Sequence, residues 1–284
     1  MIGLGSNRLS VCRRGGMSVT QAGRGGMELL AVGRMPSWAS PYSAQATAAL
    51  KAQFPTQWQT IRDYGFAHPA LVPFINEDPM LVMSLIEGLG TRTITPGKTR
   101  AYIDTHISRT EGTYVKTRAC ITEWVSENFL FGAMLASSPY NRNYIKAESN
   151  GSIQLGFGAS CPNSGWRAVL NTVYDIDCFV SKTSAYLHFD NNTVSASGNQ
   201  TISSNTLKIF SNDYAKNTYP STFKVYDHFE IYEIDKVTLI ADYVPCKHIV
   251  NGLLQNGMLD IKSATWEPNA NNVGSFTISE TPAS

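Results

Sequence analysis

The sequence predicts a mainly β protein built as an antiparallel β-sandwich. Hydrophobic residues make up 43% of the chain, charged residues 16% and aromatic residues 11%, which is typical of a packed domain and not of a disordered chain. Over the last two thirds of the chain, short strand-like runs follow one another with turn residues between them. No helical pattern interrupts these runs, and this favours antiparallel strands in two layers.

Residues 1–36 form a basic, glycine-rich segment with an internal repeat. Arg14-Gly-Gly-Met17 recurs ten residues later as Arg24-Gly-Gly-Met27, and Gly33-Arg34-Met35 is a degenerate third copy. Dense glycine costs backbone entropy and supplies little core, so we expect no independent fold here. The segment is either a disordered tail or an extended arm that becomes ordered on a partner. Candidate anchors of such an arm are Arg14, Met17, Arg24, Met27 and Arg34.

Charge is spread unevenly along the chain. Residues 1–36 hold five arginines against Glu28 alone, a net charge of +4, whereas the remainder has 18 basic and 21 acidic residues, a net charge of −3. The whole chain has a net charge of only +1, so we expect no direct, sequence-specific binding of nucleic acid. A basic arm on a mildly acidic body suggests that the arm docks on an acidic partner.

Residues 37–96 are expected to form a helical attachment or oligomerisation region. A helix is predicted over 44–53, which is rich in alanine and follows Ser43 as a possible N-cap. Pro69 and Pro73 are expected to break the next stretch into loops.

A second helix is predicted over 80–87, with Asp78 as its N-cap and Pro79 in its first turn. Its apolar residues surround the helix almost completely, so it must be buried. The sequence allows this helix to be buried either within its own subunit or against another copy of the chain. A linker is then expected at 91–101, leading into a sandwich domain that spans 97–284.

The predicted strands are short and are separated by turn residues such as Asn150-Gly151. They are expected at 102–108, 113–124, 129–136, 142–148, 152–158, 167–173, 175–181, 184–189, 206–211, 223–234 and 237–244. The last two alternate apolar and polar residues at period two, the pattern of half-buried strands. Asp235-Lys236 is expected to form the turn between them, and Pro245 to end the second because it cannot donate to a ladder.

This part of the chain also contains a set of short motifs. They are Tyr102-Ile-Asp-Thr-His-Ile107, Phe131-Gly-Ala133, Lys224-Val-Tyr226, Ile231-Tyr232, Asp242-Tyr-Val-Pro-Cys246, Asn251-Gly252, Gly257-Met-Leu-Asp-Ile261 and Gly274-Ser-Phe-Thr-Ile278. Together they resemble a laminin-G-like, concanavalin A-like jelly-roll domain, of a type common in proteins of gut bacteria and their phages. The resemblance covers about residues 97–281 and implies a fold without implying a ligand.

The five cysteines are odd in number and show no C-x-x-C spacing, so we expect reduced and mostly buried thiols. No run of about 20 apolar residues occurs, and we expect no membrane insertion. The N-terminus lacks a continuous apolar run, and we expect no secretion signal.

We expect no enzymatic activity. Glucan-cutting enzymes of the concanavalin A-like fold carry the motif E-[ILV]-D-x-x-E or E-[ILV]-D-x-E, and here Glu233-Ile-Asp235 lacks the second Glu. At three-residue spacings, Asp227, Glu230 and Glu233 cannot all share one strand face. No histidines are paired at ligand spacing, so no catalytic metal is expected. Calcium is possible at Asp190-Asn191-Asn192 and Asn212-Asp213, which also suit ordinary turns.

Three groups of residues offer the aromatic faces and amide or guanidinium groups that sugar binding needs, although each aromatic could equally pack on the sandwich. The candidate ligand-binding residues are Tyr140, Asn141, Arg142, Tyr144, Trp166, Tyr214, Asn217 and Tyr219.

These observations lead to the hypothesis of a non-enzymatic structural and adhesive protein of a phage particle, in a fibre or capsid-decoration role. The arm would bind other virion proteins, the helices would support a homo-oligomer, with a trimer expected, and the jelly roll would bind a surface glycan or protein. The alternatives are a bacterial cell-surface carbohydrate-binding module and, third, a β-glucanase-like hydrolase.

Overall fold

The computed structural model describes residues 39–135, 141–212, 219–271 and 273–283. The chain divides into two units, Met1–Ser43 and Ala44–Ser284, and the described helices and strands belong to the second. None of these helices is long and apolar enough to cross a membrane. The predicted arm lies outside the described residues, together with its candidate anchors Arg14, Met17, Arg24, Met27 and Arg34.

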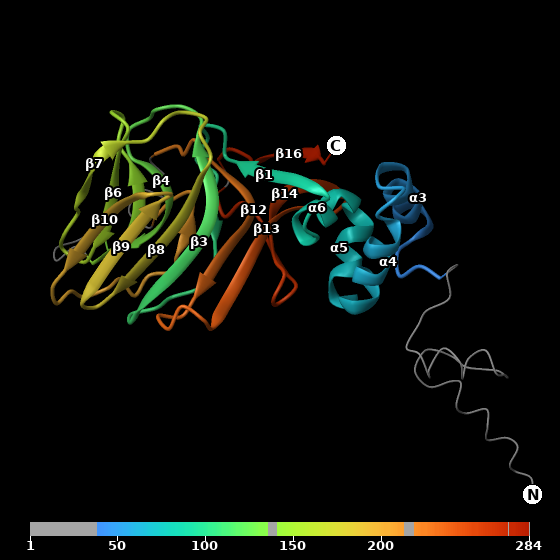
Figure 1. Cartoon of the computed structure of the whole chain (residues 1–284), viewed down its shortest axis with the longest axis horizontal. Helices are drawn as coiled ribbons and strands as arrows, with labels where there is room; N and C mark the ends of the chain where they lie inside the picture. The colour runs from blue at the N-terminus through green and yellow to red at the C-terminus, as the bar shows by residue number, and fades with distance from the viewer. Residues whose placement is uncertain (1–38, 136–140, 213–218, 272, 284) are drawn as a thin grey trace, which may run out of the picture. The chain divides into compact units, whose positions relative to one another are not determined.

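Short helices form the first part of the second unit (Figure 1). The predicted helix over 44–53 is confirmed, but the loops expected after it are wrong. Pro69 and Pro73 each lie in the first turn of a helical segment, where the missing N–H has no partner to lose. The segments are α3 (Ala44–Gln53), α4 (Trp58–Ala67), η2 (Pro69–Leu71), α5 (Val72–Glu77), η3 (Pro79–Leu81) and α6 (Val82–Leu85).

The second predicted helix is split into η3 and α6, and it is buried within its own subunit. Leu81, Val82 and Met83 are buried, and the two segments pack on β1, β12 and β13. The carboxylate of Asp78 makes no cap hydrogen bond. Its Oδ2 atom instead lies 2.6 Å from Nη2 of Arg92, which is fully buried. Asp78 therefore links the helical part to the sheet.

Among the described residues, two antiparallel sheets pack against each other (Figure 1). The larger is ten-stranded, in the order β10-β9-β8-β3-β12-β13-β14-β15, with β1 paired to β12 and β16 paired to β1. Its strands are β1 (Gly90–Thr95), β3 (Gly112–Ile121), β8 (Tyr174–Ser181), β9 (Ser184–Phe189), β10 (Asn192–Ser197), β12 (Phe223–Tyr232), β13 (Leu239–Val250), β14 (Leu253–Asp260), β15 (Thr265–Glu267) and β16 (Thr277–Pro282).

The second sheet has six strands in the order β2-β11-β4-β5-β6-β7. The chain passes from β3 in the first sheet to β4–β7 in the second, returns for β8–β10, crosses once more for β11 and ends in the first sheet. This course confirms the predicted antiparallel jelly-roll sandwich. The strands are β2 (Ile103–Asp104), β4 (Asn128–Met134), β5 (Arg142–Ala147), β6 (Ser152–Phe157), β7 (Asn163–Arg167) and β11 (Lys208–Ile209).

The core lies between the two sheets because alternate residues of each strand point inward. Phe131 on β4 and Phe229 on β12 meet edge to face across the sandwich, with ring centroids 5.7 Å apart. Both rings are buried, as are Val115 on β3 and Leu187 on β9. The outward positions of the larger sheet do not contribute to this core, and on β3 and β8 several of them carry charged side chains.

Several predicted boundaries are wrong; the strands expected over 102–108 and 206–211, for example, shrink to the two-residue strands β2 and β11. The expected linker 91–101 contains most of β1, which pairs with β12 and β16. The strand expected over 167–173 is also misplaced, because β7 ends at Arg167. In the expected linker, the threonine-rich run before Pro96 is a strand whose partner β16 lies at the far end of the sequence.

Pro245 does not end its strand, contrary to expectation: β13 continues to Val250. The N–H groups of Lys247 and Ile249, at the same parity as Pro245, point away from β14. They donate to Asp78 Oδ2 at 2.8 Å and to Glu77 Oε2 at 2.9 Å. Since an N–H at position 245 would point the same way, the ladder with β14 loses nothing to the proline.

Candidate functional site

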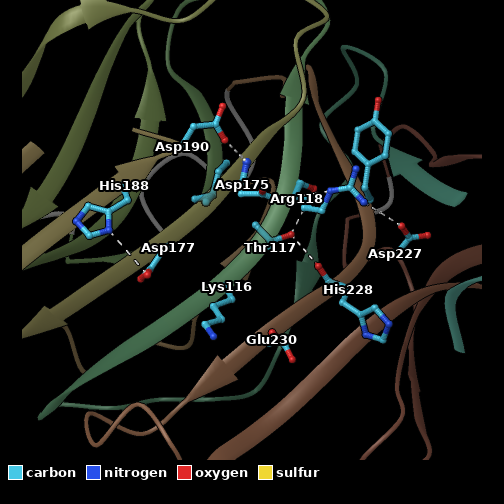
Figure 2. Close-up of a pocket in the computed structure, with 12 residues that line it drawn as sticks. Lys116, Thr117, Arg118, Asp175, Asp177, His188, Asp190, Asp227, His228 and Glu230 are labelled. Carbon is cyan, nitrogen blue, oxygen red and sulfur yellow. Dashed lines mark hydrogen bonds and ion pairs between the residues drawn. The ribbon is translucent and has the colours of Figure 1, made fainter. Parts of the chain in front are cut away.

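A cavity of about 450 Å³ lies on the outer face of the larger sheet, over β3, β8, β9 and β12 (Figure 2). Its size is within the range of about 300–1,000 Å³ that small-molecule sites occupy. Most of its lining side chains are charged or can become so. They are Lys116, Thr117, Arg118, Asp175, Ile176, Asp177, His188, Asp190, Tyr226, Asp227, His228 and Glu230.

Strand alternation places these side chains in two rows that cross the sheet. On β3, Lys116 and Arg118 are exposed while Val115 and Ala119 are buried, and on β8 Asp175 and Asp177 flank the buried Ile176. The pairing of the strands then lines up residues from distant parts of the chain. One row is Glu230, Lys116, Asp177 and His188, and the next is Tyr226, Arg118 and Asp175, with Asp190 beside Asp175.

A bulge in β12 adds two more groups to the cavity. Asp227 and His228 are extra residues in the pairing with β3, and Asp227 has a φ of +52°. Before the bulge β12 pairs with β1, and after it with β13, so the sheet forks at this point. Because the bulge breaks the alternation, Asp227 and Glu230 line the same cavity despite their three-residue spacing. Glu233 lies elsewhere and pairs with Arg109 at 3.1 Å.

The described lining is acidic, with five carboxylates against the two cations Lys116 and Arg118. Arg118 lies between two of these carboxylates, 3.5 Å from Asp175 and 3.8 Å from Asp227 (Figure 2). Burial raises the pKa of Asp227, although the N–H of Arg92 and the charge of Arg118 act against it. Two carboxylates thus hold the guanidinium in the cavity lining, where its remaining N–H groups can reach a ligand.

His228 is fixed by a second carboxylate from the neighbouring strand. Its Nδ1 atom lies 2.9 Å from Oδ1 of Asp242 on β13. Burial on its own would lower the pKa of His228, but the hydrogen bond and charge of Asp242, with the charges of Glu230 and Asp227, raise it. The imidazole is therefore oriented with Nε2 as the nitrogen available for other contacts.

A second cavity, of about 520 Å³, adjoins the first and shares Arg118, Asp227 and His228 with it. Its other side is formed by Met83–Gly88 of α6 and the following turn, with Gly90 and Thr91. The bulge of β12 therefore stands between the two cavities. A ligand longer than one small ring has room on both sides of it.

Four aromatic side chains form a third row on the same face, next to Glu230, Lys116, Asp177 and His188. Tyr232, Tyr114, Phe179 and Tyr186 are cross-strand neighbours on β12, β3, β8 and β9. The rings of Tyr114 and Tyr232 have centroids 5.6 Å apart, and those of Phe179 and Tyr186 lie 5.5 Å apart. Burial and the hydrogen bond to Glu230 raise the pKa of Tyr232 to about 12, so its hydroxyl stays a donor.

The predicted ligand-binding residues that the structure describes lie away from this face. Tyr140, Tyr214 and Asn217 are outside the described residues. Tyr144 on β5 is buried and packs edge to face on Phe129 of the neighbouring strand β4, and Tyr219 packs on the same cluster.

The remaining predicted residues also belong to the second sheet. The guanidinium of Arg142 donates to the carbonyl of Ala159 at 2.8 Å, and Asn141 precedes Arg142 at the start of β5. Trp166 on β7 packs at the edge of the core, 5.5 Å from the ring of Phe189. The structure thus brings Tyr144 and Tyr219 together but not Trp166, and their role in binding stays a prediction.

The described residues contain no group of three or more His, Cys, Asp or Glu side chains arranged to hold a metal ion. At the predicted calcium position, Asp190 Oδ1 accepts the N–H of Asp175 at 2.7 Å, and Asn192 begins β10. Asp213, from the other candidate pair, is outside the described residues. The calcium expectation stays a prediction.

Comparison with known proteins identifies no family. No family model matches the chain, and no curated protein matches it. Among solved structures, a native heptameric SAP-like pentraxin from Limulus polyphemus is 12% identical, with a TM-score of 0.39 over 67% of this chain and 97% of the other.

Two further solved structures are similar at the same low level. A putative carbohydrate binding protein from Bacteroides ovatus is 7% identical, with a TM-score of 0.45 over 69% of this chain and 62% of the other. A β-fructofuranosidase from Aspergillus kawachii, complexed with glycerol, is 11% identical, with a TM-score of 0.33 over 52% and 28%.

Proposed function

We propose that this protein is a non-enzymatic glycan-binding protein whose binding site is the outer face of the larger sheet. The observation that carries the proposal is the cavity with its two charged rows and the aromatic row beside them. Sugars present hydroxyls that bind carboxylates and guanidinium groups, and apolar ring faces that pack on aromatic side chains. This face offers both kinds of group within one short stretch of sheet.

The positions of the carboxylates favour binding of a glycan without its hydrolysis. Glu233, the first Glu of the partial hydrolase motif, is paired with Arg109 outside the cavity. The sequence lacks the second Glu of that motif. An assay for reducing-sugar release from laminarin and mixed glycans tests this part, and release above the level of a buffer blank would contradict it.

We further propose, from the sequence, that the protein is part of a virion. The basic arm of residues 1–36 would bind other virion proteins, and the protein would assemble as a homo-oligomer, with a trimer expected. Electron microscopy of the purified chain tests this arrangement. Monomers with no self-association would instead favour a stand-alone carbohydrate-binding module, such as one on a bacterial cell surface.

The binding site itself is tested by a glycan array, followed by calorimetry on the best ligand. Arg118→Gln should weaken binding roughly tenfold, because a hydrogen bond from a charged group is lost. The matched control is Arg167→Gln, which changes an exposed arginine on β7 of the other sheet. Equal affinities of the two variants would contradict the assignment of this face. Titrations in calcium and in EDTA test the calcium expectation.

A further inference from the structure

The aromatic row carries an ammonium group supplied by the chain itself. Nζ of Lys236 lies 4.4 Å from the ring centroid of Phe179, 4.8 Å from that of Tyr186 and 5.9 Å from that of Tyr114. These distances lie within the roughly 6 Å range in which an aromatic face attracts a cation. The row therefore binds a primary ammonium in the structure as it stands.

Lys236 reaches this position from the turn between β12 and β13. The turn is held by Asp235, whose carboxylate accepts the N–H groups of Val237 and Thr238 at 2.9 and 2.8 Å. Lys236 itself has a φ of +64°, a backbone conformation that residues other than Gly, Asn and Asp seldom adopt. The side chain is exposed, so it can leave the rings without unfolding the turn.

Carboxylates stand next to these rings. Asp177 and Glu230 occupy the neighbouring row, two residues along their strands, or about 7 Å away on the same face. The hydroxyl of Tyr232 donates to Glu230 Oε1 at 3.0 Å, so this carboxylate is directed toward the aromatic row. Lys116 stands between these two carboxylates, and its Nζ lies over the other end of the row, 5.7 Å from the ring centroid of Tyr114 and 5.8 Å from that of Tyr232. An ammonium on Phe179 and Tyr186 would have two π faces and the carboxylate of Asp177 within reach, which is the usual pairing for recognition of a cation.

We propose that the glycan bound on this face carries free amino groups, as in a glucosamine oligomer, and that Lys236 is an internal competitor that occupies the ammonium position until the ligand displaces it. This inference rests on the proposed function and specifies its substrate class. An acetylated amine has no charge, so the same oligosaccharide in its N-acetylated form would lack the group that the aromatic row and the carboxylates recognise.

The experiment compares two tetrasaccharides by calorimetry at constant pH and salt: the β-1,4-linked glucosamine tetramer and its fully N-acetylated counterpart. The wild-type chain should bind the amine form more tightly. Lys236→Asn, which removes the ammonium and suits the positive φ, should tighten binding of the amine form roughly threefold to tenfold. The acetylated form should not gain. Asp177→Asn should reduce the preference for the amine form.

Lys98→Asn is the matched control. Lys98 is also a lysine at positive φ, +67°, and the variant makes the same change of net charge far from the aromatic row. Equal tightening by both variants would attribute the effect to net charge and overturn the inference. Tighter binding of the acetylated tetramer would overturn it while leaving glycan binding intact. Binding of no glycan at all, on this panel or on an array, would reject the proposed function itself.

Discussion

Nη2 of Arg92 lies 2.6 Å from Oδ2 of Asp78, and both side chains are buried. The same nitrogen is 2.9 Å from Glu280 on β16, and Nη1 donates to the carbonyl of Pro245 at 3.0 Å. One guanidinium thus connects the segment before η3 with β1, β13 and β16. A buried charge held by partners from three other segments stabilises only while all of them are present.

Arg92→Met should destabilise the protein by about 3–5 kcal/mol, because the buried carboxylate of Asp78 loses its partner. Urea unfolding measures the change. Lys98→Met breaks the exposed Lys98–Glu123 pair and should cost less than about 1 kcal/mol. The double variant Arg92→Met with Asp78→Leu should recover part of the loss. A single Arg92→Met variant as stable as Lys98→Met would contradict this account.

The contact between His228 and Asp242 predicts a pH dependence of stability. The pKa of His228 is raised in the folded state, so protonated His228 stabilises the fold. This contribution is fully present below the unfolded-state pKa of about 6.5 and is lost as pH rises through the folded-state pKa. His228→Gln should remove this part of the pH slope of the unfolding free energy.

The direct measurement is an NMR titration of the His228 ring. Asp242→Asn should lower the pKa of His228. Burial, the largest influence, lowers this pKa, and the variant removes the negative charge of Asp242 that opposes it. An unchanged pKa in Asp242→Asn would show that the carboxylate does not govern this histidine.

Gly112→Ala should destabilise the protein by roughly 2–5 kcal/mol. Gly112 has a φ of +116°, and a Cβ there would collide with the carbonyl oxygen of Val180 and come 2.8 Å from Cα of Ser181. Gly165→Ala is the control, since a Cβ at that position meets nothing within 4 Å. Thermal unfolding of the two variants should differ clearly, and equal melting temperatures would contradict the close approach of β3 to β8.

Thiol labelling should discriminate among the four cysteines that the structure describes, all of them free. Burial, followed by the charges of Asp177 and Asp78 respectively, raises the pKa of Cys178 and Cys246 well above the usual range, so both should resist reagents in the native state. Cys161 is only half-buried and should react first. Peptide mapping after native labelling decides this, and modification of Cys246 at the rate of Cys161 would contradict the prediction.

The sandwich could be predicted because its strands carry their own signal. The runs 223–234 and 237–244 and the turn at Asp235-Lys236 are local features, and the structure confirms two strands and a turn there, although the bulge at Asp227 interrupts the alternation. β1 could not be recognised in the same way, because its partner β16 lies some 185 residues later in the sequence (Thr93 pairs with Ser279). The strand end predicted at Pro245 was wrong because the cost of a missing N–H depends on which side of the strand that N–H would face.

Only part of the candidate site could be predicted from the sequence. Lys116 and Arg118, like Asp175 and Asp177, stand at alternate positions between inward residues, and this pattern marks each pair as sharing a face. What the sequence does not contain is the register that lays β3 beside β8. Nor does it reveal the bulge at Asp227, which turns a three-residue spacing into a shared cavity. Aromatic residues near amides, by contrast, drew attention to Tyr144, which is buried.

The carboxylates of Glu77 and Asp78 take the hydrogen bonds that a further strand would otherwise take from Lys247 and Ile249. They therefore act as a cap on an open sheet edge, and a negatively charged one. A chain shortened to begin at Lys98 would lose this cap together with β1, and would expose unpaired N–H groups beside the apolar Ile249, Leu253 and Leu254. Such an edge is a template for strand addition, so the helical segment also protects the sandwich from aggregation.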